Sequence, residues 1–184
     1  ATPAPATPEA APATPATPVA SEEDDWAKVK AAIWPAEVQQ RAQAFLRDHP
    51  GSRFDGSAQA ALEGAQEAAR ILQRPDVRLF RSAFQLPEGM PEEQRHDIVR
   101  AARGDKDAAA RLGRNYLKDA GNGPYATRYE GWMQYAAALG NGIASYELSG
   151  FYRAADQPQL ASRFESRSRE LGYTPPPSLD NVRK

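Results

Sequence analysis

The sequence lacks several residue types on which protein chemistry commonly depends. Its 184 residues include no cysteine, which excludes disulfides, thiolate zinc sites and cysteine nucleophiles. Only two histidines are present, His49 and His96, and their wide separation argues against a histidine-rich metal centre. No apolar run approaches the roughly 20 residues that a membrane-spanning helix needs. The sequence therefore predicts a globular protein with few groups suited to catalysis, no cofactor and no membrane span.

An excess of charge of one sign is also missing. The formal net charge is -1, and Glu9 is the only charged residue before Ser21, so residues 21–184 carry 23 basic and 23 acidic side chains. Such a balance gives no strong attraction to nucleic acid or to an anionic membrane. Hydrophobic residues make up 41% of the chain, which is enough for most of it to bury a core. We therefore expect no nucleic-acid partner.

Residues 1–20 differ from the rest in composition. They are alanine, proline and threonine apart from Glu9 and Val19. Because each proline fixes its own φ and moves the preceding residue out of the α region, we expect a disordered tether here. Such tethers often follow a removed signal peptide in bacterial envelope proteins, so we expect a periplasmic or cell-envelope location, with a lipid anchor upstream of residue 1 left open. A proline-rich ligand for a binding module is the alternative.

Helical patterns begin at Ser21 and continue to Tyr173, where a run of prolines follows. Ser21 precedes four acidic residues, which predicts a capped helix start, and Pro35 suits the first turn of a second helix. Pro75 is predicted to open a further short helix that reaches Phe84. Valine, isoleucine and threonine are scarce and never alternate for long, so the chain is predicted to be all-α. Residues 21–86 are predicted to be an N-terminal helical region, either degenerate repeats or a cap.

A repeat occupies the second half of the chain. Six positions recur after a shift of 36 residues, and five of them keep the same residue type. They are Ala101, Gly104, Ala108, Leu112, Gly113 and Tyr116, which recur as Ala137, Gly140, Ala144, Leu148, Ser149 and Tyr152. An ungapped shift of this size is typical of helix-turn-helix arrays, and the glycine after each helix predicts a left-handed C-terminal cap.

The repeated pattern resembles the Sel-one-like repeat, a subclass of the tetratricopeptide-type helical repeats. The family reads approximately A-A-x-x-G-x-x-x-A-x-x-x-L-G-x-x-Y, which A-A-A-L-G at 136–140 and L-G-R-N-Y at 112–116 match. Ser149 departs from it, because the family has glycine there. The resemblance implies an α-solenoid of antiparallel helix pairs over residues 87–173, with a loose tail at 174–184. It also implies a non-enzymatic adaptor that holds a protein partner along a concave helical surface.

Two glycine-rich stretches and one histidine have structural explanations. Residues 121–124 and 140–142 follow no predicted strand and lack the Lys-Ser/Thr of a phosphate loop, so they are interpreted as repeat loops. His96 lies eight residues before Gly104, where the later units have Trp132 or Phe164. We therefore expect a half-buried structural histidine.

Aromatic and arginine side chains are concentrated in the repeat region, and these types dominate interface energetics. Tyr116, Trp132 and Tyr152 occupy repeat-core positions. Five other residues are not explained by the repeat and are predicted to form a partner-binding surface. They are Tyr125, Arg128, Tyr129, Tyr135 and Tyr146.

The sequence thus favours a protein–protein interaction module of the bacterial envelope, and it leaves two alternatives open. One is an immunity or inhibitor protein that blocks a secreted toxin or hydrolase. The other is an accessory factor that positions a cell-wall glycan, which would need a carboxylate pair in a cleft. The acid pairs Glu63 with Glu67 and Glu92 with Glu93 fit exposed helix positions instead.

Overall fold

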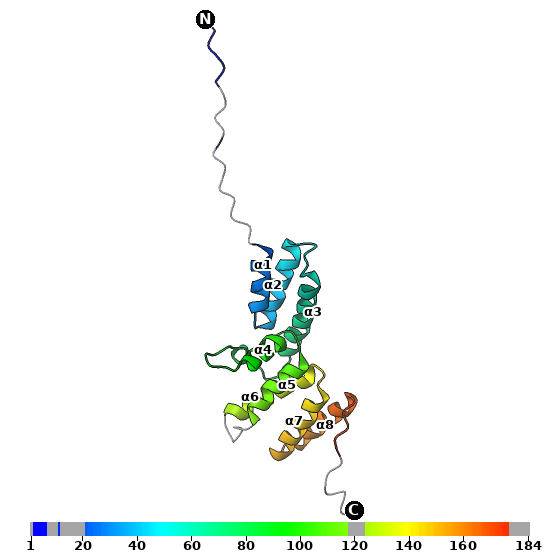
Figure 1. Ribbon diagram of the computed structural model, residues 1–184. Coiled ribbons are helices and arrows are strands. Elements are labelled where there is room, and N and C mark those ends of the chain that lie inside the picture. The colour runs from blue at the N-terminus through cyan, green and yellow to red at the C-terminus, as the bar shows by residue number, and fades with distance from the viewer. Residues whose placement is uncertain (1, 7–10, 12–20, 118–123, 177–184) are drawn as a thin grey trace, which may run out of the picture.

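The computed structural model describes residues 2–6, 11, 21–117 and 124–176, with the side chains of Pro124 and Tyr125 left out. Within these ranges the chain forms eight α-helices, one 3-10 turn and no strand, so the all-α prediction is confirmed (Figure 1). The helices are α1 (Glu22–Ala31), α2 (Pro35–Asp48), α3 (Asp55–Leu72), α4 (Glu92–Ala101), α5 (Lys106–Asn115), α6 (Pro124–Ala138), α7 (Gly142–Ala154) and α8 (Pro158–Glu170). The 3-10 turn is η1 (Arg81–Ala83).

Three predicted segments fall largely outside the described ranges. Of the expected tether, residues 2–6 and 11 are described and have no regular secondary structure. Of the expected tail, residues 174–176 are described, and they too have none. The glycines of the predicted repeat loop at 121–124 lie outside the described residues.

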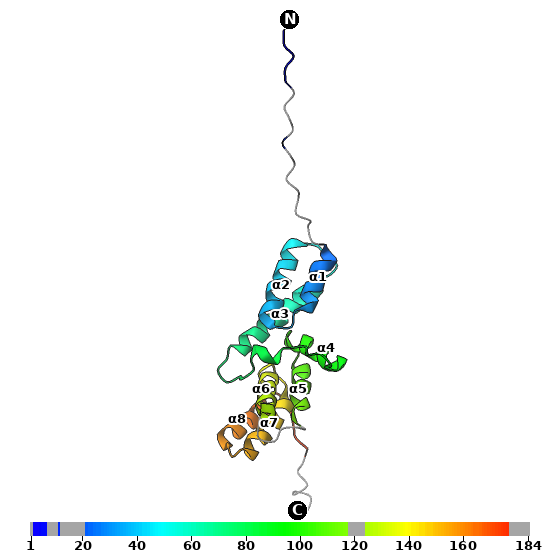
Figure 2. The same cartoon turned by 90° about the vertical axis from the view of Figure 1, so that its left-hand side faces the viewer.

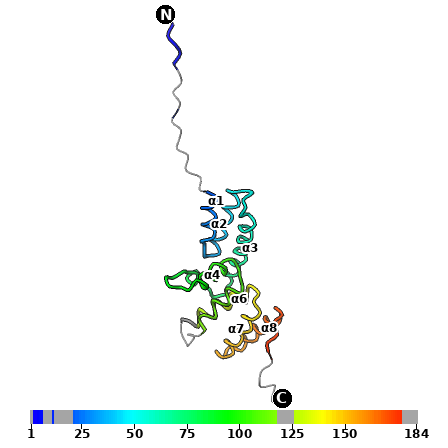
Figure 3. Tube along the Cα trace, in the orientation of Figure 1, coloured from blue at the N-terminus to red at the C-terminus, as the bar shows by residue number. Residues whose placement is uncertain are grey.

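Helices α1–α3 form one end of the molecule (Figures 1 and 3). The expected helix starts are confirmed, because the Ser21 hydroxyl accepts a hydrogen bond from the Asp24 N–H and Pro35 is the first residue of α2. The ring of Trp26 stacks on Phe54 with centroids 5.1 Å apart, beside the buried Phe45. These aromatic contacts give α1–α3 a small core of their own.

The expected helix from Pro75 is wrong, because residues 73–91 consist of turns and irregular chain, with η1 in between and no α-helix. We call residues 73–91 the crossing segment. Val77 and Leu79 are both buried, and this alternation is the pattern of an extended chain buried on one side. The segment lies against α6 at Gly131, where a Cβ atom would come within 2.5 Å of the Arg78 carbonyl oxygen.

One kind of glycine turn follows each of α4, α6 and α8. Gly104, Gly140 and Gly172 have φ values of 81°, 107° and 82°, as expected for left-handed C-terminal caps. In each turn the N–H of the next residue bonds the carbonyl five residues earlier: Asp105 to Arg100, Asn141 to Ala136 and Tyr173 to Ser168. Neighbouring helices pack on one another along this part of the chain (Figure 2).

A close backbone contact joins the two parts. A Cβ atom at Gly64, in the middle of α3, would lie 2.1 Å from the Arg103 carbonyl oxygen in the α4–α5 turn. The Arg103 guanidinium reaches the last turn of α1, where it donates to the carbonyl oxygens of Val29 and Ala32 at 2.8 and 3.1 Å. Only a residue without a side chain permits this approach of α3, so Gly64 sets the position of the N-terminal helices.

Candidate functional site

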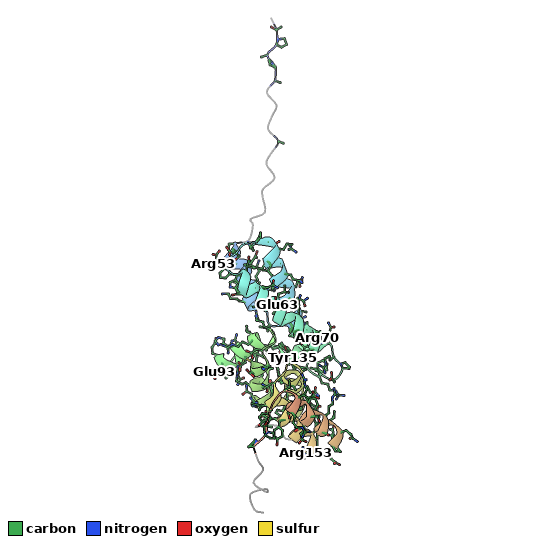
Figure 4. The ribbon with its side chains drawn as sticks, turned by 90° about the vertical axis from the view of Figure 1, so that its right-hand side faces the viewer. Arg53, Glu63, Arg70, Glu93, Tyr135 and Arg153 are labelled. Carbon is green, nitrogen blue, oxygen red and sulfur yellow. The ribbon has the colours of Figure 1, made fainter. Side chains whose placement is uncertain are left out.

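The structure removes two residues from the predicted partner-binding surface. Tyr129 is 2% exposed and Tyr135 is 0% exposed. Tyr135 lies in the middle of the molecule, whereas Arg53 and Arg153 lie near opposite ends (Figure 4), and its hydroxyl donates to the Ala101 carbonyl oxygen at 2.5 Å. Burial raises the pKa of Tyr135 above its ordinary value and that of Tyr129 to about 12. Both are core residues, and placing them on the surface was wrong.

Of the other three predicted residues, Arg128 and Tyr146 have described side chains, and each contacts a different aromatic ring. Arg128 is exposed, and its guanidinium carbon lies 5.7 Å from the centre of the Tyr116 ring. Tyr146 is half-buried, with its ring centroid 5.3 Å from that of Tyr173. The side chain of Tyr125 lies outside the described residues. Arg128 and Tyr146 thus remain accessible but engage different aromatic partners.

His96 is not half-buried as expected. Its side chain is 59% exposed and pairs with Glu92, whose carboxylate lies 3.1 Å from its Nε2 atom. The buried positions of α4 are instead Asp97, Ile98 and Ala101. The position eight residues before the glycine is thus exposed in α4, whereas Trp132 at the same offset in α6 is buried, and the repeat register does not carry over to this helix.

A groove bounded by the crossing segment, α6 and α8 is a candidate functional site. It has a volume of about 400 Å³, within the usual range of ligand sites. We call it the arginine groove. Its lining consists of Arg74, Asp76, Val77, Gln134, Ala137, Ala138, Arg163, Phe164, Arg167 and Glu170.

Three arginines line the groove. Asp76 accepts two hydrogen bonds from Arg74, at 3.0 and 2.7 Å, and a third from Arg163 at 2.9 Å. Arg163 and Arg167 come from one face of α8, because a spacing of four residues is about one helical turn. Arg167 has an exposed pair with Glu170 at 3.7 Å. The bonds from Arg74 and Arg163 connect the crossing segment to α8.

The floor of the groove is held by a buried polar network. The Gln134 side chain accepts from the Arg78 N–H at 2.8 Å and donates to the Tyr152 hydroxyl oxygen and to Glu130, at 2.8 and 3.1 Å. The Tyr152 hydroxyl in turn donates to Glu130 at 2.7 Å. Every hydrogen-bonding atom of the Gln134 amide group is thereby engaged, so this residue fixes the crossing segment on α6 and has no free N–H donor for a ligand.

The chemistry of the groove is that of anion recognition. The hydrogen bonds from Arg74 hold the pKa of Asp76 below its ordinary value. A carboxyl group that stays ionised is poorly suited to be a general acid. Across the described residues, no group of three or more His, Asp or Glu side chains is arranged to hold a metal ion. Arginine guanidinium groups, by contrast, match carboxylate geometry through paired N–H donors.

The sequence contained a signal for only part of this site. Arg163 and Arg167 at a spacing of four on a helix could have been recognised as one basic face. Arg74 and Asp76 could not be joined to them, because the contact spans 87 residues. Gln134 carries no motif.

Comparisons with protein-family models, with curated proteins and with solved structures find no match for this chain. Over the part of the chain that the structure describes, no helix combines the length and apolar character needed to cross a membrane.

Proposed function

We propose that the chain is a non-enzymatic protein–protein interaction module. We further propose that α5 with α6 and α7 with α8 are Sel-one-like units of a short α-solenoid. The identical hydrogen-bond pattern at Gly104, Gly140 and Gly172 supports this assignment, because a repeated turn is what a stacked helix-pair array requires.

The arginine groove is the observation that carries the functional proposal. It is open to solvent, it is lined by apolar as well as charged side chains, and three separate segments form it. Arginine is one of the residue types that contribute most to binding energy at interfaces. The groove replaces the predicted tyrosine surface as the place where we expect a partner to dock.

We also propose a location in the bacterial envelope. The alanine, proline and threonine composition of residues 1–20 supports this location. Subcellular fractionation of the producing cell, with the chain detected by antibody, tests it. Recovery in the cytosolic fraction would contradict the location without affecting the binding proposal.

Affinity capture with the full chain tests the function. The groove variant is Arg163→Gln with Arg167→Gln, and the control is Arg153→Gln with Arg169→Gln. Arg153 and Arg169 both pair with Glu165 outside the groove, so the control removes the same number of charges nearby. We expect one dominant partner that is retained by wild type and control and lost by the groove variant.

Other outcomes change the proposal in defined ways. Equal capture by the wild type, the groove variant and the control variant would show that the partner does not bind at the groove. The absence of any stoichiometric partner would contradict the interaction module. A partner that is a hydrolase or toxin and loses activity in the complex would replace the adaptor with the inhibitor alternative.

A further inference from the structure

The arginines of the groove keep donors that the fold does not use. Each guanidinium carries five N–H donors. Arg163 uses one terminal nitrogen on Asp76, and Arg167 has only its long contact to Glu170. Both side chains line the groove and are about half exposed, so their remaining donors are accessible to a ligand there.

The charge balance of the lining selects the kind of anion. Three guanidinium groups face two carboxylates, Asp76 and Glu170, which leaves an excess of one positive charge. Asp76 is held by two arginines and is committed to the fold, whereas the pair of Arg167 with Glu170 is exposed and weak. A monoanion matches this excess better than a dianionic phosphate does.

Four apolar residues line the groove together with the arginines. They are Val77, Ala137, Ala138 and Phe164, and Gln134, which also lines the groove, offers no free donor. These apolar side chains can contact the methylene groups of an acidic side chain and an aliphatic neighbour, because burying apolar surface is favourable. The two alanines contribute small side chains, which leaves room for a peptide backbone.

From these observations we infer that the arginine groove binds an acidic side chain of an extended peptide segment, with the carboxylate held by Arg163 and Arg167. The inference rests on the proposed function and names the chemistry of the partner at this site. In the bound state the peptide carboxylate accepts hydrogen bonds from Arg167 and displaces its long contact with Glu170, while Arg74 remains bonded to Asp76.

Fluorescence anisotropy with short labelled peptides and the full chain tests the inference. The probe is an alanine- and leucine-containing peptide with one central glutamate and with both ends blocked, so that it carries a single charge. Its twin has glutamine in place of glutamate. We expect the glutamate probe to bind about tenfold more tightly than the twin, because hydrogen bonds to a charged group are roughly twice as strong as neutral ones.

The variants assign the effect to the groove. Arg167→Gln is expected to weaken binding of the glutamate probe about tenfold, and the described structure ties Arg167 to no other segment, so its fold should persist. Arg169→Gln, on the same helix but outside the lining, should leave binding unchanged. Far-UV circular dichroism of both variants checks that α8 is intact.

Several results would overturn the inference. These are equal affinity for the two peptides, an equal loss in the Arg169 variant, and tighter binding of a third peptide with phosphoserine at the central position. If the glutamate probe binds no more tightly than its twin while affinity capture still depends on the groove, the proposed function is supported and recognition of an acidic side chain is contradicted. If the glutamate probe binds as expected and no partner is captured, carboxylate binding in the groove is supported and the adaptor function is contradicted.

Discussion

The two ends of the molecule bury their cores in different ways. In α1–α3 the aromatic rings of Trp26, Phe45 and Phe54 pack around a few small residues, and polar contacts close the end of the unit. From α4 to α8 the chain instead repeats one glycine turn, and a single larger core runs along the helices. The larger core also takes in one side of α3, so the two parts are not independent.

Helix α3 contributes residues to both the small core and the large core. Ala58 and Leu62 belong to the small core, whereas Ala61, Ala65 and Ala68 belong to the large one. These sets interleave at the spacing of one helix face, so the two cores meet along neighbouring strips of that face. One continuous apolar face of α3 therefore joins the aromatic unit to the array of repeated turns without a linker.

Trp132→Ala should have the largest effect on stability. Trp132 is 1% exposed and contacts Phe84 and Tyr135 in the large core, so truncation is expected to lower the free energy of unfolding by about 3–5 kcal/mol. Trp26→Ala, in the half-buried aromatic cluster, should cost clearly less. Urea denaturation followed by far-UV circular dichroism measures both, and equal losses would contradict the difference between the two cores.

Gly64→Ala should come second, because it forces apart the two regions. Its Cβ would meet the Arg103 carbonyl oxygen, and overpacking of this kind costs on the order of 1–3 kcal/mol. Gly56 lies in the same helix with open space around it, so Gly56→Ala should instead stabilise by about 0.5 kcal/mol. Thermal denaturation of the two variants gives opposite shifts if the contact is real, whereas shifts in the same direction would argue against it.

Arg103→Met tests the polar half of the same contact. It removes this donor from the Val29 and Ala32 carbonyl oxygens; Val29 still accepts from the Ala32 N–H, whereas a buried oxygen left unsatisfied at Ala32 costs about 1–3 kcal/mol. Amide hydrogen exchange should accelerate in α1 more than in α7 and α8. Arg100→Met, at an exposed position on α4, serves as the control and should change little. Uniform acceleration over all helices would contradict a local role.

The smallest effect should be a pH dependence confined to the N-terminal end. Hydrogen bonds from His49 and Lys28 hold the pKa of Asp25 below its ordinary value. The stabilisation is therefore complete above the ordinary carboxyl pKa and is lost as the pH falls through the lowered one. The fall in Tm on acidification should be shallower in His49→Gln than in wild type. Identical pH profiles would show that the contact of His49 with Asp25 contributes nothing.

Local signals in the sequence were sufficient for the helix ends. Ser21, Pro35 and the glycines at 104, 140 and 172 act through their own backbone and nearest neighbours, and all five appear as predicted. Non-local features could not be predicted in the same way. Tyr129 and Tyr135 were predicted to lie on the partner-binding surface because the repeat pattern did not require them. Other segments of the chain bury both residues, and the sequence near a tyrosine does not indicate which distant segments pack on it.

The crossing segment shows again that local sequence does not determine non-local packing. Its apolar residues were interpreted as a short helix, yet Val77 and Leu79 are buried at alternate positions and Gln134 supplies a partner for the Arg78 N–H. The choice between helix and extended chain is made by α6, 56 residues later in the sequence. The arginine groove was missed for the same reason, since it exists only when the crossing segment lies beside α8.

The position of the crossing segment has a consequence for how the protein is synthesised. During translation, α3 and residues 73–91 leave the ribosome well before α6, on which Val77, Leu79 and Phe84 are finally buried. The apolar side of α3 also stays exposed during this interval, because later helices supply part of the core against which it is buried. Contacts between residues far apart in sequence also form slowly. The nascent chain therefore exposes an alanine-rich helix face and an unpaired extended segment, and a chaperone would have most to protect in the interval before α6 is complete.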